Sequence, residues 1–379
     1  MAVAAPERWD VAVVGAGIVG CAIARELAQP GRSVLVLEAG RSVAADTSCR
    51  AMGHIGLYDE SEAQLALSVL ARATWDEIAA RLPPAAEYIR RGSLWLASNA
   101  DEYEESSRKW DRLRRHGIEA ALVDPDELYR LEPNVRPGLA GGLRVPGDAV
   151  IDATGATQFL ADEARRAGAV IRTETAVRSL DADGVVLADA SIVRAERVVV
   201  AAGWQTPRLI PELPIRPRKG HIARSVPRPG WIRHNLSEIG YMAETRPTAG
   251  DSISMVVQPR VSGQYLFGAT RQYAGPSLEV DPQVIEALMR VIRSFVPGFA
   301  DLAIETTWAG LRPAGPDSVP IIGAWPACPS WIVAAGHEGI GITTSLATAR
   351  LVRELLDRAT PSVPLEPYSP RRLRLPAPE

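Results

Sequence analysis

The residues best suited to chemistry near the start of the chain are three glycines and an acid. Gly15, Gly17 and Gly20 follow the apolar run Val11 to Val14, and Glu38 ends a second apolar run about 20 residues further on. Gly15 allows a tight turn, Gly17 lets the backbone approach a pyrophosphate, and Gly20 lets a helix pack on a strand. An acid at the position of Glu38 accepts hydrogen bonds from ribose hydroxyls. The spacing therefore predicts a dinucleotide-binding site.

A strand, a helix and a second strand must position these residues. The run Val11 to Val14 has the composition of a buried parallel strand, and a helix is expected from about Ile18 to Ala28. Pro30 and Gly31 end this helix. Its N-terminal N–H groups and dipole favour phosphate binding. The predicted cofactor-binding residues of this segment are Gly15, Ala16, Gly17, Ile18, Val19, Gly20, Glu38 and Ala39.

A second strand ends on glycine in the middle of the chain. Arg197 to Ala201 reads as a buried strand, and Ala202 and Gly203 follow it. This ending fits a second close approach of the backbone to the nucleotide. It also fits an ordinary turn from a strand into a loop.

The overall composition is that of a globular protein with about two domains. The chain has 379 residues, of which 46% are hydrophobic and 23% charged, and its net charge is −3. This charge argues against a nucleic-acid partner, which normally binds a basic domain. Cys21, Cys49 and Cys328 have neither the spacing of a disulfide framework nor the number needed for an iron–sulfur cluster, so a reduced cytoplasmic location is expected. No apolar run of about 18 residues indicates a membrane span, and no metal site is predicted.

The pattern of elements predicts an α/β (α+β) fold with a Rossmann-like nucleotide domain and a discontinuous antiparallel-sheet domain for the substrate. Helices are expected at 62–81, 101–115, 152–167, 282–295 and 343–358, and a hairpin at 256–269. The nucleotide domain is expected to comprise 1–88, 146–214 and 306–366, and the substrate domain 89–145 and 215–305. The Pro- and Arg-rich tail, 367–379, is expected to be poorly ordered or to contact a partner.

Beyond the first glycines, several segments resemble the D-amino-acid oxidase (DAO) superfamily of FAD-dependent amine oxidoreductases over nearly the whole chain. Within it, the chain looks most like glycine oxidase and, more closely, the β subunits of D-hydroxyproline dehydrogenase, opine oxidase and hydrogen cyanide synthase. The segments that carry the resemblance are the glycine turn with Glu38, Thr47 to Ile55, Arg91 to Trp95, Pro217 to His221, Trp308 to Asp317, Val319 to Gly323 and Gly336 to Ile342.

The resemblance implies a set of site residues. Arg312, in the sequence Gly-Leu-Arg-Pro, is expected to hold the substrate carboxylate, for which a guanidinium fork is well suited. His54, His337, Tyr241 and Arg271 are candidates to line the active site, and each also fits a structural role. Further cofactor contacts are expected from Arg50, Gly53, His54, Ala202, Gly203, Gly310, Gly336, Gly339, Ile340, Gly341, Ile342 and Thr343.

The resemblance also implies the reaction. Gly336 to Gly341 would let the backbone approach the flavin ring, and the helix expected from Thr343 would direct its positive end toward the flavin. We expect hydride transfer from a small amino acid or secondary amine, with D-hydroxyproline or D-proline as the first choice, to flavin N5. This transfer requires orientation of the substrate and no strong side-chain base.

Departures from the family pattern point to electron transfer to a partner. The segment Thr306 to Arg312 has no cysteine for covalent flavin attachment, so FAD is expected to bind non-covalently. The stretch Tyr265 to Ala269 lacks the lysine that activates oxygen in related oxidases, and Val145 to Ala169 lacks a histidine for covalent FMN. These gaps favour a dehydrogenase, the catalytic subunit of a complex whose partner subunits carry iron–sulfur or additional flavin (FMN) centres. Such partners would place a cytoplasmic chain peripherally at a membrane.

Two alternatives stay open. The first is a stand-alone glycine, sarcosine or D-amino-acid oxidase that produces hydrogen peroxide. The second, more remote, is a tRNA-modifying or non-catalytic flavin module, which the negative net charge disfavours.

Overall fold

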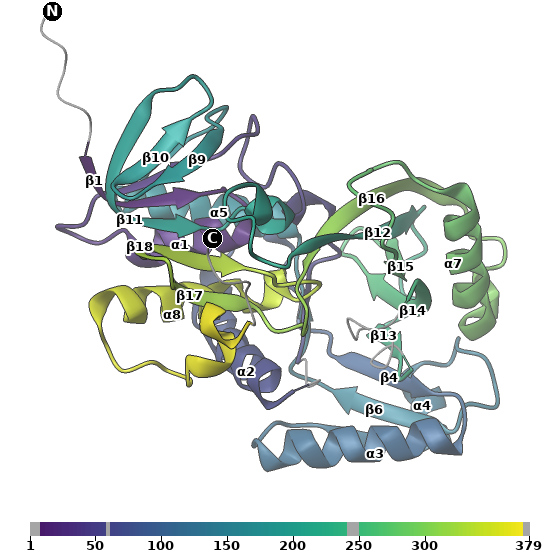
Figure 1. Cartoon of the computed structure of the whole chain (residues 1–379). Helices are drawn as coiled ribbons and strands as arrows, with labels where there is room; N and C mark the ends of the chain where they lie inside the picture. The colour runs from purple at the N-terminus through teal and green to yellow at the C-terminus, as the bar shows by residue number, and fades with distance from the viewer. Residues whose placement is uncertain (1–7, 58–60, 241–249, 374–379) are drawn as a thin grey trace, which may run out of the picture.

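Two large β-sheets, each covered by helices, make up the protein (Figure 1). The structure is a computed structural model that describes residues 8–57, 61–240 and 250–373. The α-helices are α1 (Ile18–Leu27), α2 (Glu62–Ile78), α3 (Ala100–Arg115), α4 (Pro125–Leu131), α5 (Ala153–Arg166), α7 (Pro282–Phe295) and α8 (Gly341–Asp357).

The first sheet has the strand order β17-β18-β11-β1-β2-β8, with β10 and β9 continuing from β11. Its strands are β1 (Arg8–Val14), β2 (Val34–Leu37), β8 (Val170–Arg172), β9 (Val177–Asp181), β10 (Gly184–Leu187), β11 (Ile192–Val200), β17 (Ile321–Trp325) and β18 (Cys328–Ala335). Strands β18, β11, β1, β2 and β8 are parallel neighbours, so their carboxyl ends lie along one edge of the sheet.

Alternate side chains of β1 pack in two different hydrophobic cores, one on each face of the sheet. Val11 and Val13 belong to the core that contains residues of α1, α5 and α8. Ala12 and Val14 belong to a second core on the other face, beside Val185 of the β9–β10 hairpin. A strand buried on both faces has the continuous apolar run seen in the sequence.

The second sheet has the order β16-β12-β15-β14-β13-β4-β6-β5. Its strands are β4 (Ser93–Ala97), β5 (Ala121–Val123), β6 (Gly141–Val145), β12 (Arg216–Ser225), β13 (Asn235–Glu238), β14 (Ser252–Pro259), β15 (Tyr265–Arg271) and β16 (Ile304–Ala314). A short ladder of β3 (His54–Ile55) and β7 (Ala149–Val150) completes the described strands. Figure 1 shows α7 on the outer side of the second sheet and α3 beside β6.

The structure confirms the predicted α/β class, with a first sheet that is parallel at its centre and a second sheet that is antiparallel except where β13 pairs with β4, and it differs from two expectations. Residues 306–314, expected in the nucleotide domain, belong to β16, which pairs with β12 in the second sheet. The expected poorly ordered tail is packed up to residue 373: Tyr368 is buried, and its hydroxyl donates a hydrogen bond to the Ala63 carbonyl. Burial of the Tyr368 ring, with its hydroxyl hydrogen-bonded, stabilises an ordered tail in spite of its proline- and arginine-rich composition.

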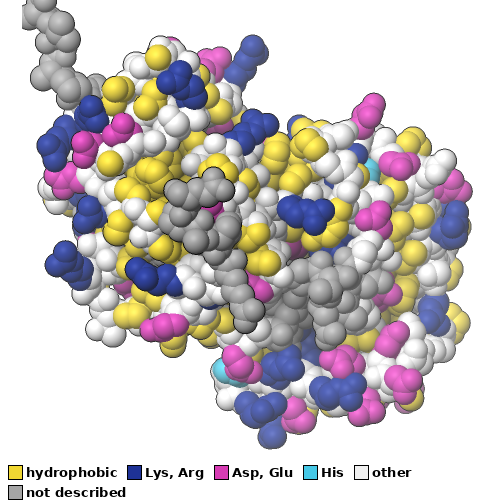
Figure 2. All heavy atoms as spheres, in the orientation of Figure 1, with side chains coloured by type: hydrophobic (Ala, Val, Ile, Leu, Met, Phe, Trp, Pro, Cys, Tyr) yellow, Lys and Arg dark blue, Asp and Glu magenta, His cyan; other side chains and the backbone are white. Residues whose placement is uncertain are grey.

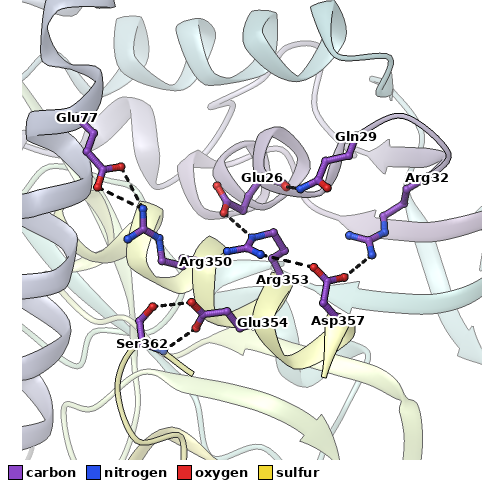
Figure 3. Close-up of polar contacts among 9 residues, drawn as sticks. All are labelled: Glu26, Gln29, Arg32, Glu77, Arg350, Arg353, Glu354, Asp357 and Ser362. Carbon is purple, nitrogen blue, oxygen red and sulfur yellow. Dashed lines mark hydrogen bonds and ion pairs between the residues drawn. The ribbon is translucent and has the colours of Figure 1, made fainter. Parts of the chain in front are cut away.

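Ion pairs fix α8 against α1 and α2 (Figure 3). Arg353 Nε donates to Glu26 Oε1 at 2.8 Å, and Arg350 Nη2 lies 3.1 Å from Glu77 Oε2. These contacts add to the apolar packing of α8 in the core, and the first turn of α8 reaches the edge of the first sheet. On the outer surface, acidic and basic side chains are interspersed over the face shown in Figure 2.

Candidate active site

The glycine turn has the close backbone contacts that the sequence predicts. Gly15 has φ +102°, and a Cβ there would lie 2.6 Å from the Ala201 carbonyl oxygen. A Cβ on Gly20 would lie 1.9 Å from the Gly15 carbonyl oxygen, so α1 packs directly on the turn. Gly17 is the N-cap residue of α1 and has no side chain that could accept a hydrogen bond from the first N–H groups of the helix. This end of the helix therefore presents backbone to a cavity, as a phosphate site requires.

Glu38 is fixed beside this turn by backbone N–H groups. Its Oε2 accepts from Ala16 N–H and its Oε1 from Gly40 N–H, each at 2.7 Å. A carboxylate has about four lone-pair positions, so the remaining ones can accept from ribose hydroxyls. Ser48, which the sequence analysis did not single out, accepts from the N–H of Ile18 at 3.0 Å.

One continuous cavity lies between the two sheets, at the carboxyl ends of the parallel strands β1, β2, β11 and β18. In an open α/β sheet this is the edge where ligands bind. The predicted residues on its wall are Gly15, Gly17, Ile18, Val19, Glu38, Ala39, Arg50, Gly53, His54, Ala202, Gly203, Gly310, Arg312, His337, Gly339, Gly341 and Ile342.

Other predicted residues lie behind the wall. Thr343 Oγ1 donates to the His54 carbonyl at 2.9 Å, so it ties α8 to β3. Ile340 is buried, and Gly336 has φ +71°, packed against Ile321. Ala16 and Gly20 act through the backbone contacts described above. Tyr241 lies outside the described residues.

The second sheet contributes the opposite wall, on which Arg312 lies. Its Nη1 donates to the Thr270 carbonyl at 2.9 Å. A Cβ on Gly220 would lie 2.4 Å from that same Nη1, so the guanidinium packs directly on the glycine backbone. Gly220 is therefore the residue that makes room for Arg312 on the wall.

The structure does not place Arg271, a predicted active-site residue, on the cavity wall. Its side chain is buried, with Nε 3.7 Å from Glu338 Oε1. Arg218 Nη1 lies 3.8 Å from the same oxygen. Glu338 itself does line the cavity. Glu338 is not among the residues predicted from the sequence, although it is the one charged residue inside the segment Gly336 to Gly341.

His54 belongs to a polar cluster next to the cavity. Its Nε2 lies 3.1 Å from Ser93 Oγ and 3.3 Å from Asn235 Nδ2, and Asp148 Oδ2 is 3.8 Å away. Burial, aided by the charge of Lys109, lowers the pKa of His54 to about 4. Burial raises the pKa of Asp148 to about 6. His54 is thus a neutral hydrogen-bonding group near pH 7.

His337 is neutral for the same reason. Burial lowers its pKa to about 4, and its Nε2 lies 3.0 Å from Thr348 Oγ1. This contact holds the glycine-rich segment on α8, so the second predicted histidine has a structural partner as well as a place on the wall.

The residues present fit a flavin dinucleotide. Besides the glycine turn and Glu38, Arg50 lines the cavity, and its Nε is buried without a hydrogen-bond partner among the described residues. A buried cation with an unused donor suits a charged ligand. At the Gly203 end, Trp204 Nε1 donates to Asp46 Oδ2 at 2.8 Å, and both residues line the cavity.

The comparison with known families agrees with this fold. The family of FAD dependent oxidoreductases named DAO matches residues 10–355. The chain belongs to this family, so it is an FAD-dependent oxidoreductase and FAD is its cofactor. The resemblance to the DAO superfamily inferred from the sequence is confirmed.

Individual relatives cover almost the whole chain. D-amino acid dehydrogenase from Cereibacter sphaeroides is 26% identical, and the alignment covers 93% of each chain. Glycine oxidase from Bacillus licheniformis is 29% identical over 92% of this chain and 93% of the relative. The crystal structure of glycine oxidase from Geobacillus kaustophilus superposes with a TM-score of 0.86 and 26% identity, covering 96% of this chain and 98% of that one.

Two further findings concern the described residues only. None of their helices is long and apolar enough to cross a membrane. None of their His, Cys, Asp and Glu side chains form a group of three that could hold a metal ion.

Proposed function

We propose that this oxidoreductase dehydrogenates a small amino acid or secondary amine, with D-hydroxyproline or D-proline as the preferred substrates. The observation that carries the proposal is the place of Arg312 in the same cavity as the predicted flavin-binding residues. Relatives named D-amino acid dehydrogenase and glycine oxidase support the amino-acid class. FAD, held by the glycine turn and Glu38, would supply the acceptor for the hydride of the carbon that carries the amine.

The protein's own contribution is to bind and orient the substrate. Arg312 offers a planar fork that matches a carboxylate, and its Nη1 is held by a hydrogen bond to the Thr270 carbonyl. The low pKa of His54 and of His337 leaves both imidazoles uncharged, so neither competes with Arg312 for the carboxylate. The substrate carboxylate is then oriented by the guanidinium of Arg312.

We further propose that electrons leave through a partner subunit rather than directly to oxygen. Neither lysine of the chain, Lys109 or Lys219, is among the described residues that line the cavity. Lys109 Nζ instead lies 4.9 Å from the Trp95 ring centre. A partner that carries iron–sulfur or flavin centres, and a cytoplasmic location with or without peripheral membrane association, belong to this proposal.

The test is anaerobic addition of D-proline, D-hydroxyproline, glycine, sarcosine and L-proline to the purified holoenzyme, followed by air. Bleaching of the flavin absorbance by D-proline or D-hydroxyproline is the expected result, with slow recovery in air. Fast recovery with stoichiometric hydrogen peroxide would instead identify the stand-alone oxidase. Failure of every amino acid to bleach the flavin would remove the substrate class.

A further inference from the structure

The carboxylate of Glu338 lies on the cavity wall and is paired with two buried arginines outside the cavity. Arg218 and Arg271, both with side chains 1% exposed, lie 3.8 and 3.7 Å from its Oε1. Neither arginine is among the cavity-lining residues, whereas Glu338 is. The two guanidinium groups therefore offset the cost of burying the carboxylate and fix its position.

The carboxylate retains unused acceptor capacity. Its Oε2 accepts from Gly339 N–H, while Oε1 has no hydrogen-bond partner among the described residues. The side chain is 8% exposed. An ionised carboxylate accepts hydrogen bonds only, so the group that completes this site must be an N–H or O–H donor.

Glu338 is also next to the predicted carboxylate anchor. Its N–H donates to the Pro313 carbonyl at 2.9 Å, directly after Arg312 in the chain. Arg312 and Arg218 are cross-strand partners on β16 and β12. The wall thus presents a guanidinium group beside a carboxylate. An α-amino acid has the complementary pair, a carboxylate and an amine on one carbon.

Glu338 has an unusual backbone conformation. Its φ is +44°, in the left-handed region that glutamate seldom adopts. Glycines occupy the neighbouring position Gly339 and the earlier Gly336. Strained residues of this kind occur often at ligand sites, so the conformation is consistent with a functional side chain.

We propose that Glu338 binds the amine nitrogen of the substrate, accepting a hydrogen bond from it while Arg312 holds the carboxylate. This inference rests on the proposed function and extends it, because it assigns recognition of the amine as well as of the acid. The site then selects α-amino acids over carboxylic acids of the same shape that lack the amine. A carboxylate that only balanced Arg218 and Arg271 would give no such selection.

The test uses two ligands that differ only at the amine. In 2-aminoisobutyrate the α-carbon carries an amino group, and in trimethylacetate a methyl group takes its place. Neither compound has a hydrogen on the α-carbon, so neither can be dehydrogenated. Binding of each to the FAD-loaded enzyme is measured by the change in flavin absorbance, for the wild type, Glu338→Gln and Glu305→Gln. Glu305 is a partly exposed acid on β16 that pairs with Arg224, so its variant is the matched control.

The wild type is expected to bind 2-aminoisobutyrate at least about 10-fold more tightly than trimethylacetate, because a charge-assisted hydrogen bond is gained. Glu338→Gln should reduce this ratio to about 3-fold or less, mainly by weakening 2-aminoisobutyrate binding, while Glu305→Gln keeps the wild-type ratio.

Two results would overturn the proposal: equal binding of both ligands by the wild type, or an unchanged ratio in Glu338→Gln. The wild-type comparison needs no variant, so the proposal remains open to refutation even if Glu338→Gln fails to fold. Trimethylacetate reports the carboxylate anchor alone. Failure of the wild type to bind either ligand would therefore count against the proposed function together with this inference, whereas an unchanged ratio counts against Glu338 only.

Discussion

The guanidinium of Arg312 lies directly on the backbone of Gly220. A Cβ at Gly220 would be 2.4 Å from Nη1, 2.6 Å from Nη2 and 2.7 Å from Cζ of Arg312. A side chain at this position on β12 would therefore displace the group that we assign to the substrate carboxylate. The glycine belongs to the segment Pro217 to His221, which also carries part of the family resemblance.

Gly220→Ala is expected to weaken substrate binding without loss of FAD. Moving Arg312 by about 1 Å should lower kcat/KM by roughly 10- to 100-fold, mostly through KM. The measurement is steady-state kinetics with an artificial electron acceptor. Gly240→Ala is the control, since no described atom lies within 4 Å of a Cβ there. Equal kinetics for the two variants would argue against a role of Arg312 in binding.

Glu38→Gln is expected to weaken FAD binding. The substitution removes the charge from two backbone hydrogen bonds of 2.7 Å and from the proposed ribose contact. A loss of about 1.5–3 kcal/mol corresponds to roughly 10- to 150-fold in the FAD dissociation constant, measured by titration of the apoprotein. The exposed Glu196, which pairs with Arg8, provides the control substitution Glu196→Gln. Unaltered FAD affinity in Glu38→Gln would show that the acid does not contact the nucleotide.

The stability of the protein should fall on acidification below pH 6.5. The pKa of His54 and of His337 is about 4 in the folded state, against 6.5 for an ordinary histidine. The unfolded chain therefore takes up these protons first, and stability is lost as the pH falls from 6.5 toward 4. Each histidine contributes roughly 3 kcal/mol to this loss. Asp148, whose pKa is raised to about 6, acts in the opposite sense between pH 4 and 6 and offsets part of it.

Denaturant unfolding at pH 7.5 and 5 measures this effect. His337→Gln, which can keep a hydrogen bond to Thr348, should show a smaller difference in unfolding free energy between the two pH values than the wild type. The partly exposed His116, paired with Glu62, gives the control His116→Gln, which should keep the wild-type difference. The same pH dependence of the unfolding free energy in all three proteins would contradict the contribution of His337.

Arg353→Ala is expected to destabilise the contact between α8 and α1 only modestly. The side chain is 28% exposed and pairs with Glu26 of α1. Such a partly exposed pair is worth about 0.5–1 kcal/mol, or a decrease in Tm of roughly 1–3 °C. Arg108→Ala removes pairs within α3 alone and should leave Tm nearly unchanged. A larger decrease for Arg108→Ala than for Arg353→Ala would contradict this comparison of the two helices.

The part of the site that could be predicted from the sequence is the part made of consecutive residues. The order of strand, glycine turn, helix and acid is a local pattern, and Gly15, Gly20 and Glu38 have the contacts that this pattern requires. The family resemblance added Arg312 and the segment Gly336 to Gly341, of which His337, Gly339 and Gly341 line the same cavity as Arg312.

The remainder of the site depends on contacts between distant segments. Arg218 and Arg271 meet Glu338 only because β12, β15 and the turn after β18 converge. His54, Ser93 and Asp148 likewise come from separate strands and a turn. No spacing within the sequence predicts such contacts. Residues 306–314 are expected in the nucleotide domain, but as part of β16 they pair with β12, a partner that their apolar residues do not indicate.

We assign the binding of the substrate carboxylate, beside bound FAD, to Arg312. The most direct measurement is the rate of anaerobic flavin reduction at increasing D-proline concentration, for the wild type and Arg312→Met. We expect equal FAD content in the two proteins. The substrate dissociation constant should rise at least about 100-fold in the variant, because the charged hydrogen bonds between Arg312 and the substrate carboxylate are lost. An unchanged dissociation constant in Arg312→Met, with flavin reduction still saturating, would contradict this assignment.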